Sequence, residues 1–235
     1  MDRELLIERR FRGPPDSGNG GYSCGLLGAL MPGASEVTLR LPPPLDTPMK
    51  VEKRPGGGLA AINAGVVVME AVPSELDASI PGTLSLSEAE DAASRFEGFD
   101  NHAFPSCFVC GPEREEGDGL RIFPGDLESG VSAAPWSPHP DFADSSGLVR
   151  PEIVWAALDC PTGWATFSAA PDAGLMLLGR LAARILRPVS AEQTYVAVAW
   201  PTGRGGRKHY ATGAILSAEG EPVAVSRATW IELKS

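Results

Sequence analysis

Two stretches of this chain have an apolar pattern typical of buried helices, and each is followed by a run of strand-like segments. The first is predicted over residues 20–31, where Asn19 is a good N-cap and apolar residues recur at helical spacing. The second is predicted over residues 151–167, where Pro151 favours a helix start and the apolar face is wide. A helix that is apolar on most sides must be surrounded by protein, so each half needs a sheet around it.

Strands are predicted from alternating and β-branched residues on either side of these helices. In the first half the expected strands span residues 4–11, 36–41, 49–54 and 59–72. In the second half they span residues 119–123, 129–135, 175–188, 193–201 and 209–233, the last with a hairpin turn at Glu219-Gly220. This order of elements predicts an α+β fold with antiparallel strands. No Gly-x-Gly-x-x-Gly or Walker loop lies between a strand and a helix, which disfavours a nucleotide-binding fold.

Residues 73–118 are interpreted as a connector between the two halves. Ser85 and Glu88 have the spacing of a capping box and predict a short amphipathic helix there. We expect an N-terminal half that includes much of the connector, over residues 1–100, and a C-terminal half over residues 101–235.

Charge and composition limit the function classes. The chain has 20 Lys and Arg against 30 Asp and Glu, a net charge of −10, which argues against nucleic acid as the main partner. No apolar run approaches the roughly 18 residues of a membrane span, so we expect no membrane partner. The N-terminal residues hold no apolar block of the secretory type, and four cysteines do not make a disulfide scaffold. A cytoplasmic protein is therefore expected.

The segment GLVRPEIVWAALDCPTGWA, residues 147–165, resembles the central helix of hotdog-fold thioesterases, especially the phenylacetate-pathway type. Those proteins enter the helix with a His-Gly-Gly step and place a catalytic Asp nine residues after the His. Here Arg150 is in the position of the His, and Asp159 follows nine residues later. The closing strands over residues 204–233 are also similar to that family.

In the first half, Asn19-Gly20-Gly21 resembles the His-Gly-Gly step itself, and its ninth position is Gly28 rather than an acid. The resemblance implies a double hotdog, that is, two tandem copies, each a long central helix wrapped by an antiparallel sheet. It implies one composite site, with the glycine step from the first copy and Asp159 from the second. The implied substrate is an acyl-CoA, with coenzyme A as part of the substrate and no separate cofactor or metal. The assembly is expected to be a monomer of fused halves or a homodimer.

Physical chemistry gives these residues roles in thioester hydrolysis. The N–H groups of Gly20 and Gly21 at a helix N-terminus can stabilise an oxyanion. Asp159 on an apolar helix is partly desolvated, which raises the pKa of a carboxyl group and makes it a better base. Asn19 can orient the water or the carbonyl. The alternatives are structural, because Asp159 could bond a local backbone group before Pro161, and Asn19 could serve only as a cap.

Other candidate residues are expected to bind the substrate. Arg204, Arg207 and Lys208 form a basic cluster in an acidic chain, which suits the phosphates of coenzyme A. An ordinary hairpin turn with solvated charges explains the same cluster. Tyr22 and Trp155 are candidate substrate-binding residues beside the two halves of the site, although such aromatic residues also serve as core.

Cys107-Phe-Val-Cys110 is a CxxC pair in a loop rich in Pro and Gly. A zinc site needs further ligands. His102 is the nearby candidate, while Cys24 and Cys160 are distant in the sequence. A redox CxxC normally opens a helix after a strand. We therefore interpret the pair as a packing feature.

An acyl-CoA thioesterase is the function that these observations favour. The alternative is a catalytically silent protein on the same fold that binds acyl or aromatic ligands. A hydratase is disfavoured because no Asp-x-Asn-x-x-His segment is present. A Ser-His-Asp triad has no support, since the chain lacks a Gly-x-Ser-x-Gly elbow.

Overall fold

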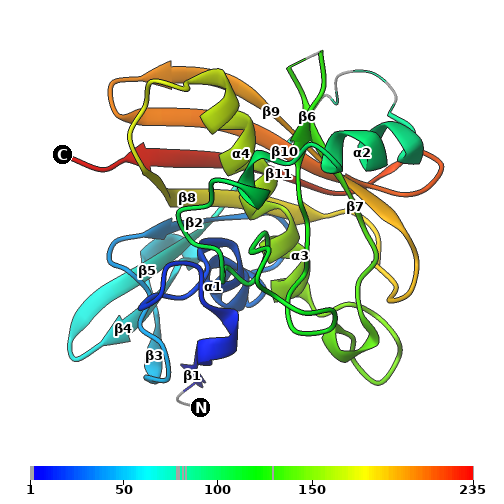
Figure 1. Cartoon of the computed structure of the whole chain (residues 1–235). Helices are drawn as coiled ribbons and strands as arrows, with labels where there is room; N and C mark the ends of the chain where they lie inside the picture. The colour runs from blue at the N-terminus through cyan, green and yellow to red at the C-terminus, as the bar shows by residue number, and fades with distance from the viewer. Residues whose placement is uncertain (1–2, 78–79, 81, 83, 129, 235) are drawn as a thin grey trace.

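One antiparallel sheet of 11 strands runs through the computed structural model, which describes residues 3–77, 80, 82, 84–128 and 130–234 (Figure 1). The strand order within these residues is β1-β3-β4-β5-β2-β8-β11-β10-β9-β7-β6. The strands are β1 Arg3–Leu5, β2 Ser35–Leu39, β3 Met49–Lys53, β4 Leu59–Asn63, β5 Val66–Pro73, β6 Gly125–Asp126, β7 Ser132–Trp136, β8 Met176–Ile185, β9 Tyr195–Gly205, β10 Lys208–Leu216 and β11 Pro222–Glu232. Residue 129, at the start of the strand expected over residues 129–135, lies outside the described residues.

The two halves of the chain join edge to edge in this sheet. Strands β1 to β5 form one side and β6 to β11 the other, and β2 pairs with β8 at the junction. The pairing runs from Ser35 opposite Ala183 to Thr38 opposite Arg180. The sheet is therefore continuous across the junction, so each of its faces extends over both halves.

Helices cover both faces of the sheet, but unequally (Figure 1). The helices are α1 Gly20–Gly28, α2 Leu86–Ala93, α3 Pro151–Ala157 and α4 Asp159–Ala169, and the short 3-10 turns are Arg9–Phe11, Pro55–Gly57, Glu97–Phe99 and Pro140–Phe142. The main core lies under α1, α3 and α4 and includes Ala197 of β9. Val196 and Val198, which alternate with Ala197, belong to a second apolar cluster with Ala89 of α2. Because side chains alternate across a strand, α2 covers the opposite face of the C-terminal half. The predicted capping box of α2 is present, since Ser85 and Glu88 bond each other's backbone N–H.

The helix expected over residues 151–167 is interrupted at Leu158. Helix α3 ends at Ala157 and α4 begins at Asp159. Pro161 is the third residue of α4, and proline has no N–H to donate to the preceding turn. The break therefore makes Asp159 the first residue of a new helix.

Of the strands expected from the sequence, one is much shorter than expected and another is not formed. Over residues 4–11, only Arg3–Leu5 is a strand, and Arg9–Phe11 forms a 3-10 turn that buries Phe11. Residues 119–123 form no strand, although Leu120 and Ile122 are both buried. Arg121 between them has a φ of 53°, which takes the backbone out of the extended region. The pattern of apolar residues was therefore not enough to predict these two strands.

The α+β class predicted from the order of elements is confirmed. Among the described residues, no helix combines the length and the apolar character that crossing a membrane requires.

Candidate active site

Asp159, at the start of α4, meets the N-terminus of α1 from the other half of the chain. Its Oδ2 atom accepts hydrogen bonds from the Gly21 N–H at 2.7 Å and from Asn19 Nδ2 at 3.1 Å. Asn19 is also the N-cap of α1, since its Oδ1 accepts from the Tyr22 N–H at 2.9 Å. The side chain of Asn19 thus caps the helix with one atom and holds the carboxylate with the other. The hydrogen bonds of the Asp159 carboxylate come from α1, not from the local backbone before Pro161.

Three glycines on one side of α1 allow this close approach. A Cβ atom at Gly21 would lie 2.4 Å from Asp159 Cβ and 2.8 Å from the Trp155 carbonyl oxygen. At Gly25 and Gly28 a Cβ atom would lie 2.8 Å and 2.6 Å from side-chain atoms of Trp155. The three positions are spaced i, i+4 and i+7, which places them on one face of the helix. These three glycines therefore form the surface through which α1 packs on α3 and α4. The close packing brings the Gly21 N–H within hydrogen-bond distance of the Asp159 carboxylate.

The Asp159 carboxyl group is buried, with 1% of the residue exposed. Burial raises its pKa to about 7, and the nearby Cys107 acts in the same direction. The hydrogen bonds from Gly21 and Asn19 lower the pKa and only partly offset the burial. The second carboxyl oxygen, Oδ1, has no hydrogen-bond partner among the described residues. This atom is the one that remains available to accept a proton.

A cavity of about 980 Å³ lies beside Asp159 and the N-terminus of α1. Such a volume is typical of a site for a small organic ligand. Both halves build its wall, and most of its side chains are apolar. They include Leu39, Leu41, Phe104, Trp164, Phe167, Leu175, Met176, Leu178, Trp230, Ile231 and Leu233.

Gly20 supplies the free backbone donor at this wall. It is the first residue of α1 and lines the cavity, and its N–H has no acceptor among the described residues. The sequence predicted two donors, Gly20 and Gly21. The Gly21 N–H is instead occupied by Asp159 at 2.7 Å. One N–H at the positive end of the helix dipole, on a residue of the cavity wall, is therefore left without a partner among the described residues.

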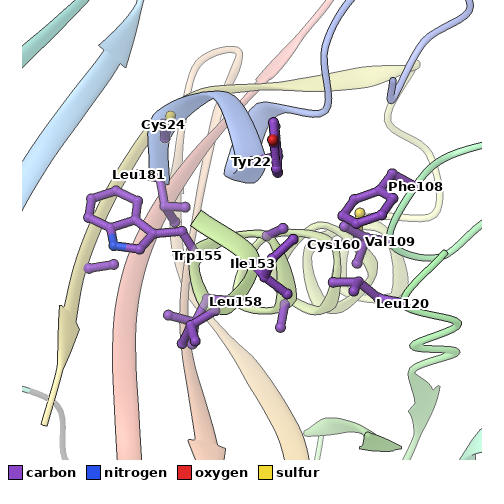
Figure 2. Packing of buried hydrophobic residues seen from close by; sticks show 14 of the residues in the cluster. Tyr22, Cys24, Phe108, Val109, Leu120, Ile153, Trp155, Leu158, Cys160 and Leu181 are labelled. Atoms are coloured by element: carbon purple, nitrogen blue, oxygen red, sulfur yellow. The ribbon is translucent and has the colours of Figure 1, made fainter. Parts of the chain in front are cut away.

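Tyr22 and Trp155, predicted to contact substrate, are core residues. Neither belongs to the cavity wall within the part of the chain that the structure describes. Tyr22 stacks on Phe11 with ring centroids 4.0 Å apart, and Trp155 packs between α1 and the sheet (Figure 2). Tyr22 follows Gly20 by two residues, about 200° around the helix, so it faces away from the cavity. The structure therefore places both residues outside this cavity wall, and their binding of substrate stays a prediction.

Arg204, Arg207 and Lys208 lie on the hairpin between β9 and β10. None of them is among the cavity-lining residues that the structure describes. Arg204 Nη1 lies 4.0 Å from Asp172 Oδ1, and the two chain neighbours of Asp172 line the cavity. Arg207 Nη1 donates to the Glu232 carbonyl at 2.8 Å, which gives it a structural partner. Arg204 is therefore the member of the basic cluster that the geometry ties to the cavity's edge.

Sequence reasoning missed most of the apolar wall. Gly163 and Phe167 follow Asp159 at steps of four residues on α4, so they share its face, and all three line the cavity. This spacing was a usable signal. The walls from residues 39–43 and 175–179 carried none, because these residues adjoin the long-range pairing of β2 with β8, which no local pattern records.

Comparison with known proteins identifies the fold. No protein-family model matches the sequence, and no curated protein matches it. The TesB protein of Mycobacterium avium subsp. paratuberculosis is 12% identical, with a TM-score of 0.67 over 98% of this chain and 92% of that one. A conserved protein with a hot dog fold from Alicyclobacillus acidocaldarius is also 12% identical, with a TM-score of 0.64 over 99% of this chain and 93% of the other. The chain is a double hotdog.

A third structure resembles this double hotdog over its full length. The acyl-CoA thioesterase II TesB2 of Mycobacterium marinum is 14% identical, with a TM-score of 0.62 over 99% of this chain and 93% of that one. At such identities the likeness establishes the fold alone. The hotdog resemblance seen in the sequence is thus confirmed for the fold, and the activity must be argued from the site.

Proposed function

We propose that this double hotdog hydrolyses acyl-CoA thioesters where Asp159 meets the N-terminus of α1. One observation carries the proposal: a buried carboxylate, held by Asn19 and Gly21, shares a cavity wall with the free N–H of Gly20. A base and an oxyanion donor are the two groups that thioester hydrolysis requires. The name of one similarly folded protein, an acyl-CoA thioesterase II, supports the same class.

In the proposed reaction the thioester carbonyl oxygen binds the Gly20 N–H. Asp159 Oδ1 takes a proton from a water molecule as the water oxygen attacks the carbonyl carbon. The Gly20 N–H and the helix dipole stabilise the tetrahedral oxyanion. When the intermediate collapses, the C–S bond breaks, and the leaving sulfur takes the proton from Asp159. The products are the free acid and coenzyme A, and the carboxylate is restored.

Each remaining part of the site has a role in this scheme. Asn19 and Gly21 hold Oδ2, so that Oδ1 keeps one orientation toward the water. The apolar wall suits the acyl chain. Coenzyme A enters as part of the substrate, and the scheme uses no separate cofactor.

Variants of the basic hairpin test whether it binds the phosphates of coenzyme A. We expect the double variant Arg204→Gln, Lys208→Gln to raise KM for acyl-CoA by about three- to tenfold, because charge-assisted bonds to phosphate would be lost. The same variant should leave KM unchanged for an acyl-pantetheine thioester, which lacks the nucleotide phosphates. Steady-state kinetics on both substrates measures the difference. If KM changed equally for the two substrates, or for neither, the hairpin would not be the site that binds the phosphates.

A catalytically silent protein that binds acyl or aromatic ligands is the second candidate. It is favoured by the presence of Asn19 where the resembled family has His, and by the 1% exposure of Asp159. A thiol-trapping assay over short-chain, long-chain and aromatic acyl-CoAs separates the two functions. An enzyme releases coenzyme A with at least one of these substrates. A binding protein releases none, and its melting temperature rises with ligand concentration.

A further inference from the structure

Three cysteine thiols from distant parts of the chain meet beside the candidate site. Cys107 and Cys110 lie in the loop that precedes β6, and Cys160 is the second residue of α4. The Sγ atoms of all three lie within 4.8 Å of one another, and those of Cys107 and Cys160 are 3.8 Å apart. All three are buried. The fold therefore supplies the CxxC pair with a third thiol that sequence distance concealed.

The spacing of these thiols matches that of a metal site. Zinc binds sulfur at about 2.3 Å in a tetrahedral arrangement, which places the sulfur atoms about 3.8 Å apart. The pair Cys107–Cys160 already has this separation. The three sulfurs can therefore close on one ion with little movement of the backbone.

The loop around the pair has the form of a tight metal-binding turn. The Gly111 N–H donates to the Cys107 carbonyl at 2.9 Å, and a Cβ atom at Gly111 would lie 2.5 Å from the Cys107 backbone. Glycine thus permits a turn tight enough to direct both sulfurs toward Cys160.

Two polar side chains surround the sulfurs with N–H donors. Asn19 Nδ2 lies 3.8 Å from the sulfurs of both Cys107 and Cys160. His102 Nε2 lies 3.2 Å from the Cys110 sulfur, and His102 Nδ1 accepts the Phe104 N–H at 3.0 Å. In a neutral imidazole that accepts at Nδ1, the proton is on Nε2, so His102 donates to the sulfur. Such donors offset the negative charge of thiolates around a metal.

We propose that Cys107, Cys110 and Cys160 bind a zinc ion as thiolates. A set of three thiolates with an oxygen ligand suits zinc among the common divalent ions. The fourth ligand is a water molecule from the cavity, whose wall includes Cys107 and Cys160. His102 and Asn19 act as hydrogen-bond donors to the sulfurs. The ion ties the connecting loop to the start of α4, and this role is independent of the proposed thioesterase activity.

Metal analysis of the purified full-length protein tests the site. Inductively coupled plasma mass spectrometry should find about one zinc per chain, because the proposal has a single site. The variants Cys110→Ser and Cys160→Ser should each lower the zinc content at least tenfold. Cys24→Ser is the matched control, since Cys24 is buried in the same core but outside the cluster, and it should keep its zinc. His102→Ala should weaken zinc affinity about 10–100-fold, as expected of a residue that supports a ligand.

Cobalt substitution keeps the test independent of how well the serine variants fold. Protein reconstituted with Co²⁺ should show thiolate-to-cobalt charge-transfer bands and the visible bands of a four-coordinate ion. Metal-free protein with four titratable thiols would overturn the proposal. So would a Cys107–Cys110 disulfide found by mass spectrometry, copper or iron in place of zinc, or zinc that Cys24→Ser removes as readily as Cys160→Ser.

Discussion

Replacing Asp159 with asparagine should lower the rate of coenzyme A release by about 10²–10⁴-fold, the usual contribution of a general base. Asparagine has nearly the same shape, and its Oδ1 can still accept the N–H groups of Gly21 and Asn19. The amide cannot take a proton from water, however. The measurement is kcat/KM in a thiol-trapping assay, with the melting temperature recorded for both proteins.

Two controls accompany this variant. Asp141→Asn removes an exposed carboxylate that is outside the described cavity wall, and it should leave the rate within about twofold, since surface changes of this kind have small effects. Acyl-CoA should still raise the melting temperature of Asp159→Asn, because the binding surface is retained. Normal turnover by Asp159→Asn would remove this residue from the mechanism.

Gly21→Val should destabilise the protein and abolish coenzyme A release. The added Cβ atom would lie 2.4 Å from Asp159 Cβ and 3.0 Å from Ala156 Cα, so α1 must move away from the other half. Overpacking of this kind costs about 1–3 kcal/mol, and more when the neighbour is backbone. The displacement also breaks the 2.7 Å hydrogen bond that orients the carboxylate. Urea unfolding measures the stability, and the thiol-trapping assay measures the activity.

Gly205→Ala is the matched glycine control. A Cβ atom there would come no closer than 3.7 Å to the Tyr210 hydroxyl oxygen, which is an ordinary contact. This variant should unfold at the same urea concentration as the parent. If Gly21→Val also unfolded at the urea concentration of the parent, the contact between α1 and α4 would not be as close as described.

Local sequence rules located the helices, and the resemblance to hotdog thioesterases pointed to the central pair of the site. The N-cap at Asn19, the capping box at Ser85, and Pro151 at a helix start each depend on neighbours within four residues, so the chain itself carries the signal. The resemblance to hotdog thioesterases, through the spacing from Arg150 to Asp159, pointed to this carboxylate. The meeting of Asn19 with Asp159 followed from the expectation that two halves pack together.

The rest depends on how the halves are rotated against each other, which no local pattern records. Tyr22 faces the core because α1 presents its glycine side to α3. Trp155 was a candidate for the cavity but fills the space left by Gly25 and Gly28. Cys160 joins Cys107 because α4 restarts at Asp159 beside the connecting loop. These contacts link residues far apart in the sequence, and only the packed structure defines them.

The glycine face of α1 also predicts how many substrates one chain can hold. A hotdog pair built from identical copies has two equivalent corners. In this chain the second corner has Gly28 in the position that matches Asp159, and the Trp155 ring packs against Gly28. Ligand titrations should therefore saturate at one equivalent per polypeptide. Under the proposed function, one corner carries the chemistry and the other serves to pack the two halves together.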